Sequence, residues 1–261
     1  MYRICKIALL VTLIGGVAGG GEFVPFVIPA KVNPAAPLNI MPQPIQTEQD
    51  RIVVREGHFY RGSERIRLWG VNFSFSANWP SHEDAEHIAR RLAAAGVNSI
   101  RCHHMDTSLY PRGLWQKDGK TLEPAALERL DYFIDQLARQ GIYINLNLHV
   151  GHPHSQYLGL PKPNTTYDKI VNIFTPELIE AQKRYARMML ERKNPYRQRK
   201  YADDPAIAIV EITNENSLFM WSATRDLQTL PEYYAKILQE KYNRWLKQRY
   251  ESTTKLKAVW S

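Results

Sequence analysis

Residues 203–216 read DDPAIAIVEITNEN: a turn, a short apolar run rich in Ile and Val, and an Asn-Glu pair where the run stops. An apolar run of this length between turn residues is typical of a buried parallel strand. Enzymes built on parallel sheets place their chemistry at the carboxyl ends of such strands. Taken alone, the pair also fits an ordinary strand-to-loop junction with a surface carboxylate.

Two upstream segments repeat this form. Residues 97–106 (VNSIRCHHMD) and 142–149 (IYINLNLH) are apolar runs that carry Arg, His or Asp toward their ends. Each follows a helical pattern that stops at a glycine, Gly96 and Gly141. Because the carboxyl ends of parallel strands meet at one edge of a sheet, these polar groups are expected to converge there.

Strands and helices alternate along the chain after a β-hairpin signal over residues 51–60. We predict core strands over 66–73, 97–104, 143–149 and 206–213, and helices over 81–95, 124–141, 175–191 and 231–250. Four βα units in a row indicate a parallel sheet with right-handed crossovers. One reading is an open, doubly wound four-stranded sheet. The other is a (β/α)8 TIM barrel of which about the first four βα units are present, since these units already fill residues 67–252.

The N-terminal 20 residues have the features of a secretory signal peptide. Arg3 and Lys6 form a basic start, residues 7–14 are apolar, and small residues follow. The apolar run is too short for a membrane span, although a retained N-terminal anchor is the alternative. We therefore expect a signal peptide over 1–20, a secreted or periplasmic protein, and no membrane association after cleavage. Residues 21–50, which contain six prolines, predict a linker or an irregular wrap without regular secondary structure.

Charge and cysteine content exclude some classes of function. Removal of residues 1–20 would lower the formal net charge from +8 to +6, and the remaining basic residues are scattered over helices. Nucleic-acid binding requires a basic stripe on a recognisable module, so no nucleic-acid partner is expected. Cys5 falls in the signal segment, which leaves Cys102 alone and excludes an intrachain disulfide. Within its apolar strand, Cys102 is better explained as a small buried residue than as a nucleophile.

Alternation within the strands separates a polar face from an apolar one. Asn145, Asn147 and His149 share one parity, opposite Ile144, Leu146 and Leu148, and Glu211, Thr213 and Glu215 share another polar face. Polar groups that point into a barrel must be paired, so they commonly mark a site. We expect Asn145 and Glu211 to form a structural hydrogen-bond layer, and His149, Asn214 and Glu215 to lie at the mouth.

The histidines raise a metal alternative. Five of them could converge: His103, His104, His149, His152 and His154. Zinc sites usually show histidines at helical spacing or a carboxylate in a recognised motif, and a His-x-His on a loop is a weak signal. A metal-dependent hydrolase therefore ranks below sugar chemistry, and no metal or cofactor is expected.

Four short segments together resemble a known family. Residues 68–72 (LWGVN), 100–106 (IRCHHMD), 146–149 (LNLH) and 213–216 (TNEN) resemble the retaining glycoside hydrolases of clan A, in particular cellulase-like family 5. The resemblance covers residues 51–261 and implies the N-terminal half of a catalytic TIM barrel. It also implies a secreted glycosidase that hydrolyses O-glycosyl bonds of a β-linked polysaccharide or oligosaccharide.

The resemblance implies roles by position. Glu215 would be the general acid/base, and Asn214 would hydrogen-bond the substrate 2-hydroxyl. Arg101 would hold the nucleophilic carboxylate. His149, and less firmly His103 or His104, would contact the sugar. Trp79, Trp115 and Trp221 would stack on sugar rings, with loop packing as the alternative for each.

One expected residue is missing. In this family the nucleophilic glutamate ends strand seven, and no second carboxylate of this sequence fits that position. Retaining chemistry needs two carboxylates about 5 Å apart. We therefore expect an incomplete, inactive fragment of a glycosidase. The alternative from another class is a non-catalytic carbohydrate-binding module.

Overall fold

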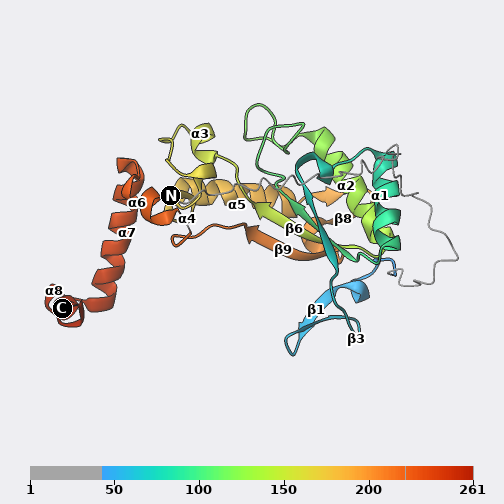
Figure 1. The fold of residues 1–261 in the computed structure, drawn as a ribbon, viewed down its shortest axis with the longest axis horizontal. Helices are drawn as coiled ribbons and strands as arrows, with labels where there is room; N and C mark the ends of the chain where they lie inside the picture. Colours follow the sequence, from blue (N-terminus) through green and yellow to red (C-terminus); the bar gives the residue numbers. More distant parts are fainter. Residues whose placement is uncertain (1–42, 221, 261) are drawn as a thin grey trace, which may run out of the picture.

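The computed structural model describes residues 43–220 and 222–260. The predicted signal peptide and most of the proline-rich segment lie outside the described residues. The centre of the molecule is a parallel sheet with the order β4-β5-β6-β9 (Figure 1). Its strands span β4 (Gly70–Ser74), β5 (Ser99–His103), β6 (Tyr143–His149) and β9 (Ile207–Thr213).

The first strand begins later than predicted. Ile66 still belongs to the hairpin, because its backbone N–H donates to the Phe59 carbonyl at 2.9 Å. That hairpin sheet comprises β1 (Ile52–Arg55), β2 (His58–Arg61) and β3 (Glu64–Arg65), after the short helix η1 (Glu48–Asp50). The chain therefore passes from the hairpin into the central sheet only at Gly70.

Three long helices begin where the sequence predicts. They are α1 (His82–Ala94), α2 (Pro124–Arg139) and α5 (Pro176–Leu190). Ser81 caps α1 by accepting the Asp84 backbone N–H at 3.1 Å, and prolines stand at the first positions of α2 and α5. These helices form one core with the sheet, and Cys102 on β5 is fully buried within it.

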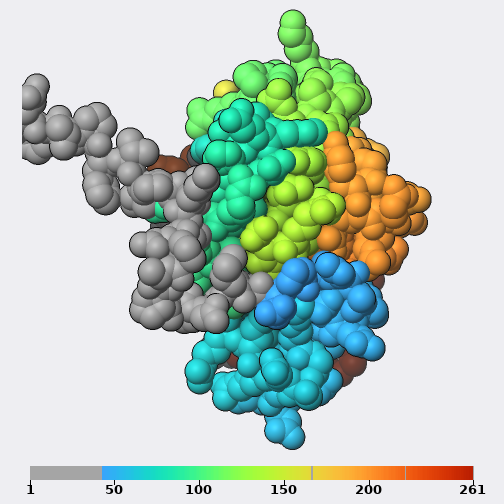
Figure 2. Space-filling model, turned by 90° about the vertical axis from the view of Figure 1, so that its right-hand side faces the viewer, coloured from blue at the N-terminus to red at the C-terminus, as the bar shows by residue number. Residues whose placement is uncertain are grey.

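The hairpin end of the molecule is closed by the segment that precedes it. The fully buried Ile45 side chain joins the main core, and its N–H donates to the Ala138 carbonyl at 2.8 Å. Arg61 bonds the Gln43 and Pro44 carbonyls. Figure 2 shows this end, with α1, α2 and the chain around residue 200 side by side above the hairpin.

Short elements fill the connections, and the sequence patterns predicted none of them. They are η2 (Phe75–Asn78), α3 (His154–Leu158), η3 (Thr166–Asp168), α4 (Val171–Phe174), β7 (Lys193–Asn194), β8 (Arg199–Lys200), η4 (Tyr201–Asp203), α6 (Ala223–Gln228) and α8 (Thr253–Trp260). A second, smaller core joins α4 and α6 to the start of α7 (Glu232–Tyr250). This core supports the loops at the carboxyl edge of the sheet.

The last helices lead away from the sheet (Figure 1). Within α7 only Tyr234 is buried, and the aromatic side chains of Tyr242 and Trp245 are 42% and 49% exposed. None of the helices in the described part of the chain is long and apolar enough to cross a membrane.

The central sheet has two open edges. In the described residues, β4 and β9 each pair on one side only. On β9, Val210 and Ile212 are 40% and 77% exposed. The apolar face of this strand therefore meets solvent.

Candidate active site

An ion pair crosses the polar face of the sheet. Arg101 on β5 binds Glu211 on β9 through two bonds, Nε to Oε2 at 2.7 Å and Nη2 to Oε1 at 2.5 Å. The Arg101 hydrogen bond is the main cause that lowers the pKa of Glu211, against a smaller opposing effect of burial. Asn145 lies 3.5 Å from the same carboxylate. Glu211 is thus held in a hydrogen-bond layer with Arg101 and Asn145.

The same guanidinium orients the asparagine at the strand end. Arg101 Nη2 donates to Asn214 Oδ1 at 2.9 Å, and the Asn214 N–H donates to the His149 carbonyl at 2.9 Å. Since the amide oxygen is occupied, the Asn214 NH2 group is the one left to donate to a ligand. Asn214 lines a cavity at the carboxyl edge of the sheet.

Two histidines line this cavity from β5. His103 Nδ1 lies 2.6 Å from Asn147 Oδ1, and since an amide oxygen only accepts, Nδ1 carries the proton. His104 stacks on Phe75 and sits in left-handed backbone at φ 54°. Burial, then His103, lowers the pKa of His104. Both predicted histidines therefore reach the same cavity as Asn214.

Glu215 completes the predicted group. It is exposed, sits in left-handed backbone at φ 44°, and lines the cavity, whose volume is about 430 Å³. Non-glycine residues in this conformation are uncommon and concentrate at functional sites. No side chain of the described residues bonds its carboxylate, which leaves both oxygens for a ligand.

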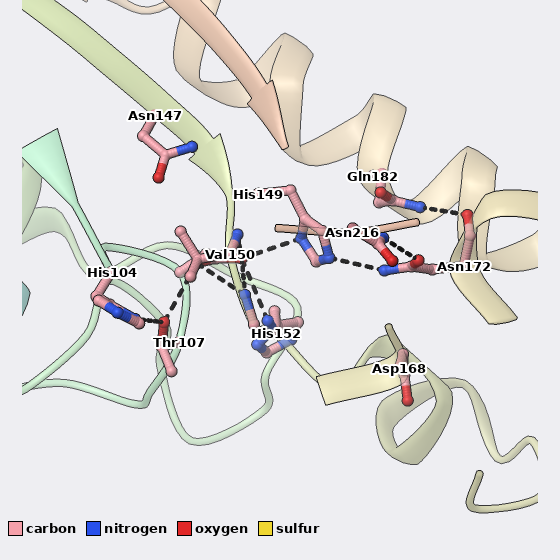
Figure 3. Close-up of polar contacts among 12 residues, drawn as sticks. His104, Thr107, Asn147, His149, Val150, His152, Asp168, Asn172, Gln182 and Asn216 are labelled. Carbon is pink, nitrogen blue, oxygen red and sulfur yellow. Dashed lines mark hydrogen bonds and ion pairs between the residues drawn. The ribbon is translucent and has the colours of Figure 1, made fainter. Parts of the chain in front are cut away.

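His149 does not face the cavity, and this corrects its expected role as a sugar contact. A chain of hydrogen bonds runs from the Ile170 N–H to Asn216 Oδ1 (2.9 Å), from Asn216 Nδ2 to Asn172 Oδ1 (2.6 Å), and from Asn172 Nδ2 to His149 Nε2 (2.9 Å). Figure 3 shows the two bonds that join Asn216, Asn172 and His149. His149 Nδ1 lies 3.0 Å from Asp106 Oδ2. Because a backbone N–H only donates, the direction of the chain is fixed: Nε2 accepts, and Nδ1 carries a proton toward Asp106. The ring is 3% exposed, and both nitrogens face protein partners.

Asp106 joins the loops that follow β5 and β6. Its fully buried carboxylate accepts the N–H groups of Val150 (3.0 Å), Gly151 (3.1 Å) and His152 (3.2 Å). Burial raises the pKa of Asp106, but His149 and these amides outweigh it and lower the value to about 2. Asp106 and His149 thus position the loop beside the cavity.

Two of the three predicted sugar-stacking tryptophans belong to the core, which corrects that expectation. Trp79 is 3% exposed and donates to the Pro111 carbonyl at 3.2 Å. Trp115 is 2% exposed, donates to the Asp106 carbonyl at 2.8 Å, and stacks on His152. Their large apolar rings are more stable in the core, where each N–H also finds an acceptor. Trp221 lies outside the described residues.

His152 and His154, the other two histidines of the metal alternative, are packed side chains. His152 stacks between Trp115 and Tyr157, and its Nε2 donates to the Gly119 carbonyl at 2.8 Å. Burial is the main cause that lowers the pKa of His152 to about 4 and that of His154 to about 2. Among the described residues, no three His, Cys, Asp or Glu side chains are placed to share a metal ion.

The sequence patterns missed one wall of the cavity. Thr165, Tyr167 and Lys169 line it from the loop after β6, and Arg225 and Asp226 line it from α6. Asp226 is paired with Arg225 at 2.9 Å and accepts the Ser222 hydroxyl at 2.5 Å. Loop residues have no periodicity, so the only available signal was the length of the loop between residues 149 and 176.

Comparisons with known proteins place this fold in a family. The family model Cellulase (glycosyl hydrolase family 5) matches residues 60–239. An endo-1,4-β-mannanase from Rhizomucor miehei superimposes with a TM-score of 0.53 at 21% identity, over 63% of this chain and 48% of that chain. A family 5 mannosidase from the same organism superimposes with a TM-score of 0.52 at 18% identity, over 66% and 50%. This chain therefore spans about half the length of these solved structures. No curated protein matches it.

Proposed function

Since this chain belongs to glycosyl hydrolase family 5, we propose that its sheet forms the first four βα units of a (β/α)8 TIM barrel that hydrolyses β-linked glycans with retention. The open carboxylate of Glu215, directly after Asn214 at the carboxyl end of β9, carries this proposal. Barrel enzymes place catalytic groups at that end of their strands.

Glu215 acts as the general acid/base. In the first step its carboxylic acid gives a proton to the glycosidic oxygen, and in the second its carboxylate takes a proton from water. Its exposure and its lack of a partner among the described residues support this assignment, because the group must meet both the leaving sugar and water.

Asn214 and Arg101 orient the substrate and its partner group. The Asn214 NH2 donates to the sugar 2-hydroxyl, a bond that strengthens in the oxocarbenium-like transition state. Arg101 holds Asn214 and Glu211 through Nε and Nη2, and its Nη1 bonds no group in the described residues. Nη1 is therefore the atom that remains for a second carboxylate. His103 and His104 contact the sugar from β5.

The nucleophile comes from residues beyond those of this sequence. Within the described residues, Asp226 shares the cavity but is buried and paired with Arg225, and Glu211 is held by Arg101. The coverage of about half of each solved relative supports a catalytic barrel completed by further βα units. The chain is exported through residues 1–20, which N-terminal sequencing of the mature protein would test.

Glycan binding tests the assignment of the cavity. The assay is calorimetry with β-1,4-mannopentaose and cellopentaose, chosen because the matched family is named for cellulase and the similar structures are a mannanase and a mannosidase. We expect binding that weakens about tenfold in Asn214→Ala, which removes one substrate hydrogen bond. Asn243→Ala, on the far part of α7, is the matched control. If neither pentamer binds, the cavity is not a glycan site.

A further inference from the structure

Lys169 is a buried cation in the cavity beside Glu215, and it has no ion-pair partner among the described residues. Its side chain lines the cavity, and the residue is only 8% exposed. No acidic side chain of the described residues lies within ion-pair distance of its ammonium group, and none accepts a hydrogen bond from it. Lysine is almost never buried unless it is paired. An anionic group of a ligand would therefore supply the partner of the Lys169 ammonium.

The backbone on both sides of Lys169 is held in place. The Asp168 carboxylate accepts the Ser155 N–H at 2.7 Å and its hydroxyl at 2.6 Å. On the other side, the Ile170 N–H donates to Asn216 Oδ1 at 2.9 Å. Figure 3 labels Asp168 and Asn216. Lys169 is thus fixed between two anchored residues.

Both anchored neighbours have left-handed backbone. The φ angle is 56° at Asp168 and 72° at Ile170. For a β-branched residue such as Ile170 this region is a true outlier, and such strain persists where the surrounding structure enforces it, typically at ligand sites. The strained turn keeps the long Lys169 side chain on the cavity wall instead of in solvent.

The other charges of the cavity do not neutralise Lys169. Asp226 is paired with Arg225. Glu215 is the other unpaired charge, and its proposed proton-transfer role requires it to stay free. On the same wall, the Thr165 hydroxyl oxygen is buried without a hydrogen-bond partner among the described residues. This wall therefore offers an ammonium and a hydroxyl, and neither has a hydrogen-bond acceptor among the described residues.

We propose that Thr165 and Lys169 form a subsite for an acidic sugar, namely a uronic acid residue of the glycan. The Lys169 ammonium pairs with the sugar carboxylate, and the Thr165 hydroxyl donates a second hydrogen bond to it. A carboxylate in place of the 6-hydroxymethyl group leaves the pyranose ring unchanged. Neutral and acidic sugar units of one glycan therefore differ only at carbon 6, the group that Lys169 would bind. The inference rests on the proposed function, because it takes the cavity as the glycan cleft.

Matched pairs of oligosaccharides test the inference with the full chain. The probes are β-1,4-mannopentaose against the β-1,4-mannuronate pentamer, and cellopentaose against its C6-oxidised counterpart, titrated calorimetrically at neutral pH and 50 mM salt. We expect at least one acidic pentamer to bind about tenfold more tightly than its neutral counterpart, as a charge-assisted hydrogen bond allows. Lys169→Met and Lys169→Gln should abolish the preference while neutral binding stays within about twofold. Lys169→Arg should keep the preference.

Lys162→Met is the matched control, because Lys162 is exposed on the same loop. Equal affinity for both members of each pair overturns the acidic subsite and leaves the proposed function standing. A preference that survives in folded Lys169→Met or Lys169→Gln, or that is lost in Lys162→Met, also overturns it. If no pentamer binds at all, the proposed function falls as well.

Discussion

Asp106 holds two loops of the site with a single carboxylate. Asp106→Asn replaces an ionised acceptor of His149 and three backbone amides by a neutral group with an NH2 that faces other donors. We expect a loss of about 3 kcal/mol in the free energy of unfolding, measured by urea denaturation. Asp118→Asn, at an exposed turn, is the control and should change it by less than about 1 kcal/mol. A similar small change in Asp106→Asn would mean that the two loops are held by other contacts.

Buried histidines predict acid sensitivity. Burial lowers the pKa of His152 to about 4 and that of His154 to about 2, so both stay neutral in the fold while the unfolded chain takes up protons below pH of about 6.5. A lowered folded-state pKa contributes stability that is complete above pH 6.5 and is lost as pH falls, for His152 down to about pH 4. The expected slope is about 1.4 kcal/mol per pH unit for each histidine.

Urea midpoints between pH 7.5 and 4 would measure that slope. His152→Gln should flatten it, and His82→Gln, at an exposed site on α1, should not. Asp106 acts in a lower window, because its pKa of about 2 preserves its contribution until pH falls from about 4 toward 2. An identical slope in wild type and His152→Gln would contradict the buried neutral state of His152.

We expect Lys169 to lower the stability of the fold while it strengthens the binding of acidic glycans. Lys169→Met keeps the length of the side chain and removes an unpaired buried charge, so we expect a gain of about 1 kcal/mol in unfolding free energy. Thermal unfolding would show it as a higher Tm, and Lys162→Met should leave Tm unchanged. A marked loss of stability in Lys169→Met would instead assign Lys169 a structural partner.

Among the secondary-structure elements, helix-start signals and strand alternation were sufficient to predict the long helices and the polar face of β6. Ser81, Pro124 and Pro176 begin their helices as predicted, and alternation in residues 143–149 fixed which side chains share the polar face. The short helices and strands in the connections were not predicted, because tertiary contacts rather than local sequence patterns stabilise them. Parity also could not tell that His149 would turn into a buried hydrogen-bond chain, since that depends on Asn172 and Asp106 from distant segments.

The exposed edge strand β9 predicts self-association. Ile212 is 77% exposed beside unpaired backbone groups, which is a template for pairing with another chain. Ile212→Lys should shift the protein toward monomer in size-exclusion chromatography without a loss of melting temperature. Ile207→Lys, at a buried position of the same strand, should unfold it. A wild-type protein that is already a stable monomer would show that the open edge is harmless.

For the whole molecule, we predict no retaining hydrolysis by residues 21–261. The described residues bring one unpaired carboxylate, Glu215, to the cavity, and retaining chemistry needs two. Catalytic groups act as a unit, so loss of one forfeits most of the rate. The measurement is turnover of aryl β-glycosides, mannan and β-glucan. Robust turnover that Glu215→Gln abolishes would reveal a second carboxylate in this chain.

The burial of Cys102 in β5 makes its thiol a chemical probe for local opening of the sheet. Burial raises the pKa of its thiol to about 12, and the side chain is fully inaccessible. In a Cys5→Ser background, an alkylating dye could react only during the moments when β5 separates from the helices that cover it. Because only the thiolate reacts, each labelling event marks one such opening. When the sheet recloses faster than the dye reacts, the labelling rate with and without glycan would report the population of the open state and whether a bound sugar lowers it.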